Sequence, residues 1–203
     1  VIQTWGSSPR QAGSIMLIRD DHHIEGSVSG GCVEGAVIEA ALAAQVSGTG
    51  KHLDFGVADE TAWNVGLSCG GSLAVLVCPI ADQGIDAGTL TRTAAQSRAR
   101  ETVCFALNIH TGKIEPTLPI PADLTESQIY NDTHFIFIQP PTARLIVVGG
   151  VHIAQHLVPM ARRIGLDVTL IDPRSAFANE ARFIECNIIA DRPETALKTM
   201  TLD

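Results

Sequence analysis

The sequence predicts an α/β protein in which an N-terminal α+β domain precedes a C-terminal domain of alternating strands and helix. Over the first 139 residues, short apolar runs with strand character alternate with glycine turns and helical segments. Gln139-Pro140-Pro141-Thr142 then interrupts this pattern, and a double proline is typical of a linker. We therefore expect two domains, residues 1–139 and 143–203. The chain begins without Met inside a strand-like run, so we also expect a fragment and an incomplete second domain.

The first domain is predicted to contain a β-hairpin around Asp20-Asp21, several other short strands and two helices. Strands are predicted at residues 1–5, 14–19, 23–28, 53–56, 72–78, 102–108 and 134–138, and helices at 32–46 and 86–98. Residues 56–71 are predicted to form a loop or short helix, and long loops in compact domains are often functional. Residues 115–134 are rich in Pro, Asp, Thr and Ser and are expected to be irregular.

The composition describes an ordinary globular protein. Of its 203 residues, 45% are hydrophobic and 18% are charged, which is enough for a large core. The net charge of −8, with 14 basic residues and no basic run, argues against nucleic acid or a membrane surface as partner. Five cysteines without the spacing of a disulfide framework predict a reducing, cytoplasmic setting.

Two cysteines lie beside glycine pairs, in Ser29-Gly30-Gly31-Cys32-Val33-Glu34 and in Cys69-Gly70-Gly71. Glycine pairs can turn several N–H groups toward one point, which suits an anion, and a neighbouring thiol is a nucleophile or soft ligand. Cys32 is expected in the first turn of the helix, where the helix dipole favours a thiolate, although Glu34 opposes this effect. Either motif alone also fits a buried cysteine beside a turn.

Three further features have both a functional and a structural interpretation. Ser8 and Arg10, in the turn Gly6-Ser7-Ser8-Pro9-Arg10, suit either phosphate contacts or a solvated turn. Cys78 and Cys104 lie in apolar runs and are expected in the core. His152 and His156 are one helical turn apart, as zinc ligands would be, but the sequence offers no evident third ligand.

The second domain follows the order of a dinucleotide-binding unit. A strand at residues 144–148, a glycine turn, a helix at 152–164 and a strand at 167–171 lead to Asp172. In this arrangement Gly149 and Gly150 would approach pyrophosphate and Asp172 would bind a ribose hydroxyl. Val151, however, occupies the position of the second glycine of the fingerprint. We expect a Rossmann-like fold with weak or absent binding of dinucleotides.

Together these motifs resemble the XdhC/CoxI family, the maturation factors of xanthine dehydrogenase and related molybdenum hydroxylases. The matching stretches are residues 4–10, 13–16, 26–34, 55–63, 65–71 and 148–174. The resemblance implies a protein that binds the molybdenum cofactor (molybdopterin), protects it during sulfuration and delivers it to an apo molybdenum hydroxylase. A cysteine desulfurase and a second copy of the chain are further partners that it suggests.

The resemblance also implies a site. Cys32 and Cys69 would be the thiols nearest the cofactor, as candidate contacts to molybdenum. The surrounding loops would be shaped by Gly30, Gly31, Gly70 and Gly71. Two alternatives remain open: an NAD(P)-dependent oxidoreductase that uses the Rossmann-like domain, and a redox or sulfur-transfer pair formed by the two thiols. A maturation chaperone is favoured over an enzyme with turnover.

Overall fold

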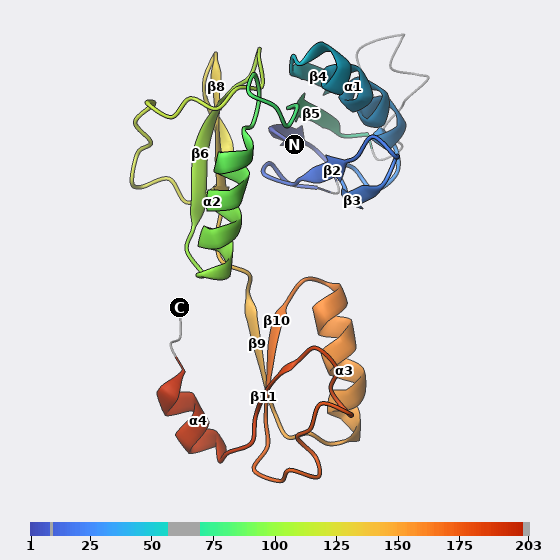
Figure 1. The fold of residues 1–203 in the computed structure, drawn as a ribbon. Helices are drawn as coiled ribbons and strands as arrows, with labels where there is room; N and C mark the ends of the chain where they lie inside the picture. Colours follow the sequence, from blue (N-terminus) through green and yellow to red (C-terminus); the bar gives the residue numbers. More distant parts are fainter. Residues whose placement is uncertain (9, 57–69, 201–203) are drawn as a thin grey trace. The chain divides into compact units, whose positions relative to one another are not determined.

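The structure is a computed structural model that describes residues 1–8, 10–56 and 70–200. The chain divides into two compact units, Val1–Pro141 and Thr142–Asp203. Helices and strands of both units are shown in Figure 1. The predicted α/β fold class is confirmed, because strands and helices occur in both units.

Most elements of the first unit coincide with the predicted ones. In chain order they are β1 Gln3–Trp5, β2 Met16–Ile18, β3 Ile24–Gly26, α1 Glu34–Ser47, β4 Lys51–Phe55, β5 Ser72–Val77, α2 Ala87–Arg98, β6 Val103–Asn108, β7 Gln128–Asn131 and β8 His134–Gln139. The sequence does not predict β7, which lies in a stretch with loop composition. It forms because it pairs with β8 in an antiparallel ladder.

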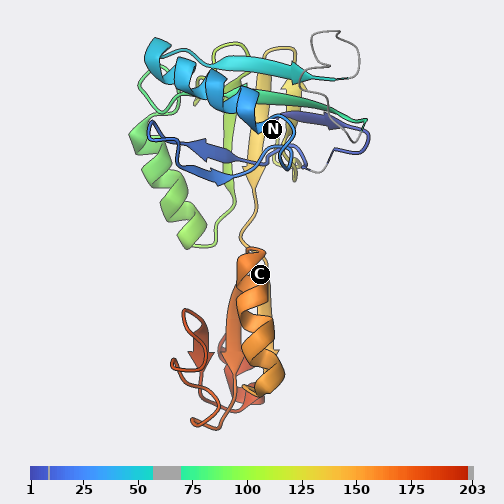
Figure 2. The ribbon, with the colours of Figure 1, turned by 90° about the vertical axis from the view of Figure 1, so that its right-hand side faces the viewer.

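The first unit is layered around β5, the central strand of the antiparallel sheet β1-β5-β4. Successive side chains of a strand point to opposite faces of its sheet. Leu73 and Val75 therefore join a core with α1, whereas Ala74 joins a second core with the sheet β6-β8-β7. In Figure 1, β5 lies between α1 and this second sheet, and Figure 2 views the same arrangement from the α1 side. The apolar run of β5 is thus buried on both faces.

Helix α1 begins later than the sequence suggests. Its N-cap is Val33, so Cys32 lies just before the helix and the expectation that it falls in the first helical turn is wrong. Gly30 and Gly31, with φ angles of +103° and +120°, cannot be helical, and the φ of −115° at Val33 also departs from that of a helix. The helix ends at Gly48, whose left-handed conformation lets its N–H bond the Ala44 carbonyl.

The second unit is a three-stranded parallel sheet with a crossover helix. Its elements are β9 Arg144–Val148, α3 His152–Arg163, β10 Asp167–Ile171, β11 Asn187–Ile189 and α4 Pro193–Thr199. The strand order is β11-β10-β9, and α3 connects β9 to β10. Ala154 and Val158 of α3 pack with Val168 and Leu170 of β10. In the described part of the chain, no helix is long and apolar enough to cross a membrane.

Candidate functional site

The loop of residues 27–34, here named the Glu34 loop, connects β3 to α1 and folds around its own carboxylate. Glu34 accepts hydrogen bonds from four consecutive backbone N–H groups, those of residues 28 to 31, at N–O distances of 2.8–3.3 Å. The hydroxyl of Ser27 donates to the same carboxylate at 2.9 Å, and the hydroxyl of Ser29 donates to its second oxygen. One side chain thus collects six donors.

The local sequence explains this arrangement. The positive φ angles of Gly30 and Gly31 curl the backbone so that successive N–H groups point inward, as in an anion-binding nest. Ser29 is buried, and its hydroxyl oxygen accepts hydrogen bonds from the N–H groups of Cys32 and Val33 at 3.1 and 3.2 Å. Ser29 therefore supplies the helix cap that the side chain of Val33 cannot supply.

The charge of Glu34 is stabilised by these donors. Burial by itself raises the pKa of Glu34, but the hydrogen bonds from Ser29, Gly30 and Ser27 outweigh it and hold this pKa well below its ordinary value. Glu34 is therefore ionised at neutral pH. The N–H groups of Gly30 and Gly31 do converge on an anion, and that anion belongs to the chain itself. A role for the two glycines in a cofactor loop stays a prediction.

Cys32 lies within this loop, and its side chain is exposed. The second motif is described only in part: Gly70 and Gly71 lie within the described residues and Cys69 lies outside them. A Cβ atom on Gly71 would lie 2.8 Å from the Trp5 carbonyl oxygen and 3.0 Å from the Ser8 nitrogen. The second glycine pair therefore packs directly against the turn that precedes Arg10. Whether Cys32 and Cys69 share a site stays a prediction.

The two phosphate-contact candidates lie in that turn. Ser8 is half-buried and its hydroxyl donates to the Arg10 carbonyl oxygen at 3.1 Å. The Arg10 side chain is exposed. The close packing of Gly71 on Trp5 and Ser8 shows that this turn and the second glycine motif occupy one region of the first unit.

Two cysteines expected in the core have different surroundings. Cys78 packs at the edge of the core between the two sheets, and burial raises the pKa of its thiol to about 12. Cys104 is exposed, so the expectation that it is a core residue is wrong. Its neighbours Val103 and Phe105 belong to the core between the sheets, and alternation along β6 turns Cys104 to the opposite face.

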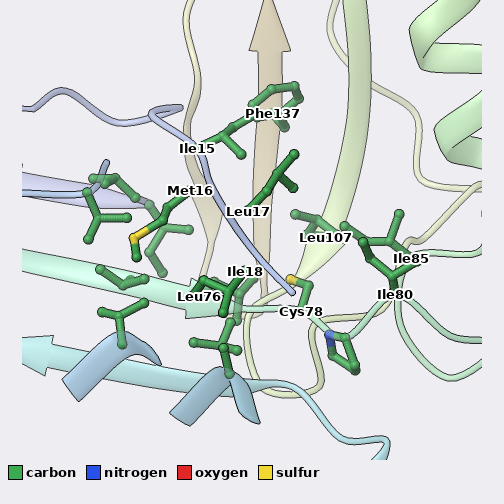
Figure 3. Close-up of a pocket in the computed structure, with 18 of the residues that line it drawn as sticks. Ile15, Met16, Leu17, Ile18, Leu76, Cys78, Ile80, Ile85, Leu107 and Phe137 are labelled. Atoms are coloured by element: carbon green, nitrogen blue, oxygen red, sulfur yellow. The ribbon is translucent and has the colours of Figure 1, made fainter. Parts of the chain in front are cut away.

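A cavity of about 660 Å³ opens within the first unit and was not predicted from the sequence. β2, α1, β5 and the second sheet contribute to its walls, and Figure 3 shows the side chains of Met16, Ile18, Leu76 and Phe137 at it. Its lining is mainly aliphatic and aromatic, and it includes Val28 of the Glu34 loop but not Cys32. The cavity therefore offers few partners for a polar, phosphate-bearing pterin.

In the second unit Asp172 is held by its own neighbours. It is only 1% exposed and accepts hydrogen bonds from the Gly150 N–H at 2.8 Å and from the Arg174 N–H at 2.9 Å. The Arg174 guanidinium donates to both carboxylate oxygens, at 2.9 and 2.7 Å. Hydrogen bonds from the Arg174 side chain, together with those from the two backbone N–H groups, hold the pKa of Asp172 well below its ordinary value.

These contacts bear on the predicted nucleotide site. Both oxygens that would bind a ribose already accept hydrogen bonds, and the Gly150 N–H points to Asp172. The Val151 side chain is 42% exposed at the start of α3. Arg174 also lies over the Phe177 ring, at 4.1 Å from its centroid. The arrangement favours weak dinucleotide binding, which stays a prediction. The ion pair between Arg174 and Asp172 was not predicted from the sequence, because Arg174 lies outside the glycine–aspartate fingerprint.

The histidine pair on α3 does not extend into a larger metal site. The Nε2 atoms of His152 and His156 are 3.4 Å apart. Over the described ranges, no group of three or more His, Cys, Asp or Glu side chains is placed to hold a metal ion. Cys69, one of the two candidate molybdenum contacts, lies outside these ranges.

The fold and its two glycine loops define a protein in which a cysteine-bearing α+β unit precedes a Rossmann-type unit. Two family models match these same parts. The model of the XdhC and CoxI family matches residues 1–56, and the model of the XdhC Rossmann domain matches residues 145–203. The chain belongs to the XdhC/CoxI family, and the expected Rossmann-like fold of the second domain is confirmed.

Similar proteins extend along most of the chain. A Bacillus subtilis protein, named as a probable subunit of xanthine dehydrogenase, is 26% identical over 97% of this chain and 66% of its own length. The Escherichia coli molybdenum cofactor insertion chaperone PaoD is 25% identical over 88% of this chain and 54% of its own length. The chain thus spans between half and two thirds of these relatives.

A solved structure supports the fold. The match to the crystal structure of a xanthine dehydrogenase from Bacillus halodurans covers all of this chain and 66% of the chain in that structure. Its TM-score is 0.79 and the sequence identity is 22%. At this identity the similarity concerns the fold.

Proposed function

We propose that this protein is an accessory factor that binds the molybdenum cofactor, protects it during sulfuration and delivers it to a molybdenum hydroxylase of the xanthine dehydrogenase type. The observation that carries the proposal is the exposed Cys32 on the hydrogen-bonded, charge-bearing Glu34 loop. Family membership supports it, as do the names of two relatives, one an insertion chaperone for molybdenum cofactor and the other a component of xanthine dehydrogenase.

The residues of the loop fit such cargo in one respect and not in another. Cysteine sulfur is a soft ligand that suits molybdenum, and Cys32 is exposed. The amide donors of Gly30 and Gly31 are engaged by Glu34 and do not suit a second anion. Contacts to the cofactor phosphate therefore fall first to the exposed Arg10 side chain, in the turn beside Gly71; the Ser8 hydroxyl, which donates to the Arg10 carbonyl oxygen, would have to exchange that partner.

The partners follow from this proposal. The client is an apo hydroxylase, and a cysteine desulfurase is the source of sulfur; a second copy of the chain would form a homodimer. All act in the cytoplasm. The oxidoreductase alternative is less favoured, because Asp172 and the Gly150 N–H are bound to each other in the second unit. The alternative of a sulfur-transfer pair depends on Cys69.

The test compares thiols in two environments. Wild type, Cys32→Ala, Cys69→Ala and the exposed control Cys104→Ala are purified from cells that make molybdenum cofactor. At equal folded concentration, released pterin, bound molybdenum and reactivation of an apo-hydroxylase are measured separately. Cys32→Ala should lower cofactor retention or sulfuration and Cys104→Ala should not. If the wild type carries no cofactor, the carrier function is rejected. If wild type, Cys32→Ala and Cys69→Ala give equal results, a role of the two thiols is rejected.

A further inference from the structure

We propose that Glu34 is a positioning residue for Cys32, because its carboxylate is the anion around which the Glu34 loop folds. The inference rests on the proposed function, in which the Cys32 thiol contacts the cofactor. Glu34 itself does not touch the cargo in this proposal. It acts through the backbone and through Ser29.

The first argument is that six donors of the loop, four backbone N–H groups and two hydroxyls, bond to Glu34. Val28 and Val33, at its two ends, are buried in the core beneath α1, at 2% and 0% exposure. Between them stand Ser29, two glycines and Cys32, which contribute no large apolar side chain to that core. Four consecutive N–H dipoles point toward one place, and without a negative charge there they repel one another. The carboxylate therefore determines the backbone path.

The second argument is a direct connection to Cys32. The Ser29 hydroxyl donates to Glu34, and its oxygen accepts the N–H of Cys32 at 3.1 Å. Moving the carboxylate releases Ser29, and releasing Ser29 frees both the Cys32 backbone and the cap of α1. The position of the thiol relative to the helix thus depends on Glu34 through a single intervening side chain.

The third argument concerns the exchange of Glu34 for its amide. Glutamine has nearly the same shape but carries one NH₂ group, which donates and cannot accept. Both oxygens of Glu34 accept hydrogen bonds: one from residues 27 to 30, the other from the Gly31 N–H and the Ser29 hydroxyl. Either orientation of the amide would therefore place an NH₂ group against N–H or O–H donors.

The experiment uses the full chain without cofactor. Glu34→Gln, Glu34→Ala and the control Glu39→Gln, an exposed position on the same helix, are compared with wild type. Amide hydrogen exchange of residues 28–33 is measured together with the alkylation rate of Cys32, resolved by peptide mass spectrometry at one fixed pH. In both Glu34 variants the amides of residues 28–33 should exchange about tenfold faster or more. The reason is that losing a hydrogen bond to a charged group raises the equilibrium constant for opening the loop by more than a factor of about ten. Glu39→Gln should match wild type.

Chemical rescue separates positioning from general destabilisation. Formate, added at constant ionic strength, should restore amide protection and the wild-type alkylation rate in Glu34→Ala, because alanine leaves room for a small carboxylate. It should have no effect on wild type. Wild-type protection in Glu34→Gln, or a Glu34→Ala variant that does not respond to formate, would overturn the proposal. Since no step uses the cofactor, failure of the carrier function would appear only in the pterin assay and is distinguishable.

Discussion

Replacing Gly150 by alanine tests how the glycine turn of the second unit is built. The new Cβ would lie 2.6 Å from the carbonyl oxygen of Phe177, a backbone atom that cannot rotate away. The turn would have to shift, and the shift would weaken the hydrogen bonds from the Gly150 N–H to Asp172 and from Arg182 to the Gly150 carbonyl. Overpacking costs about 1–3 kcal/mol, and a hydrogen bond to a buried charge contributes about 1.5–3 kcal/mol. We expect a loss of about 2–4 kcal/mol.

Gly149 provides the matched control. A Cβ atom there meets open space, and the cost comes only from its φ angle of +105°, about 1–2 kcal/mol. Both variants are measured by urea unfolding of the full chain, followed by circular dichroism. Gly150→Ala should be the less stable variant. If it unfolds with the free energy of wild type, or is no less stable than Gly149→Ala, the proposed packing of the turn on Phe177 is wrong.

Three other outcomes are expected. Because hydrogen bonding lowers the pKa of Glu34, its carboxylate stabilises the fold above the unfolded-state pKa of about 4.3, and this contribution begins to be lost below that pH. The difference in unfolding free energy between wild type and Glu34→Gln, measured by urea titration, should therefore narrow as the pH is lowered. A difference that stays constant with pH would contradict this reasoning. Calorimetric titration with NAD or NADP should show weak or no binding, and micromolar binding that is abolished by Asp172→Ala would reverse this conclusion. Burial raises the pKa of the Cys78 thiol to about 12, so Cys78 should resist alkylation in the native state and react on unfolding. Rapid alkylation of Cys78 in the folded protein would disprove its burial.

Much of the fold could be predicted because local patterns and tertiary structure agree. The apolar run of β5, the hairpin of β2 and β3, and the order of strands and helix around Gly149 each follow from periodicity and turn residues. Among the elements of the described residues, β7 and α4 lack such a pattern. β7 is polar and depends on pairing with β8, which lies a few residues further along the chain. Propensity alone cannot show such a partner.

The candidate site could be predicted less completely. The sequence identified Cys32 and Asp172 as candidate site residues. It could not show that Glu34 accepts the hydrogen bonds of the loop N–H groups or that Arg174 donates to Asp172. Both partners are only two residues away along the chain, and the direction of the Glu34 side chain depends on the glycine conformations and the helix start. In the Glu34 loop, the acidic residue three positions after the glycine pair is a signal that could have indicated an internal ion partner. Exposure of Cys104 depends on which face of β6 is covered.

The internal anion of the Glu34 loop has a consequence for the proposed carrier function. A carboxylate tethered beside its donors acts at an effective concentration far above that of dissolved phosphate or sulfate. The loop is therefore complete before any cargo arrives, and buffer anions do not compete for it. A carrier whose loop folded around the phosphate of its cargo would have to disorder that loop on every release. Under the proposed carrier function, handing over the cargo would leave the loop as it was, and the free energy of release would not include refolding it.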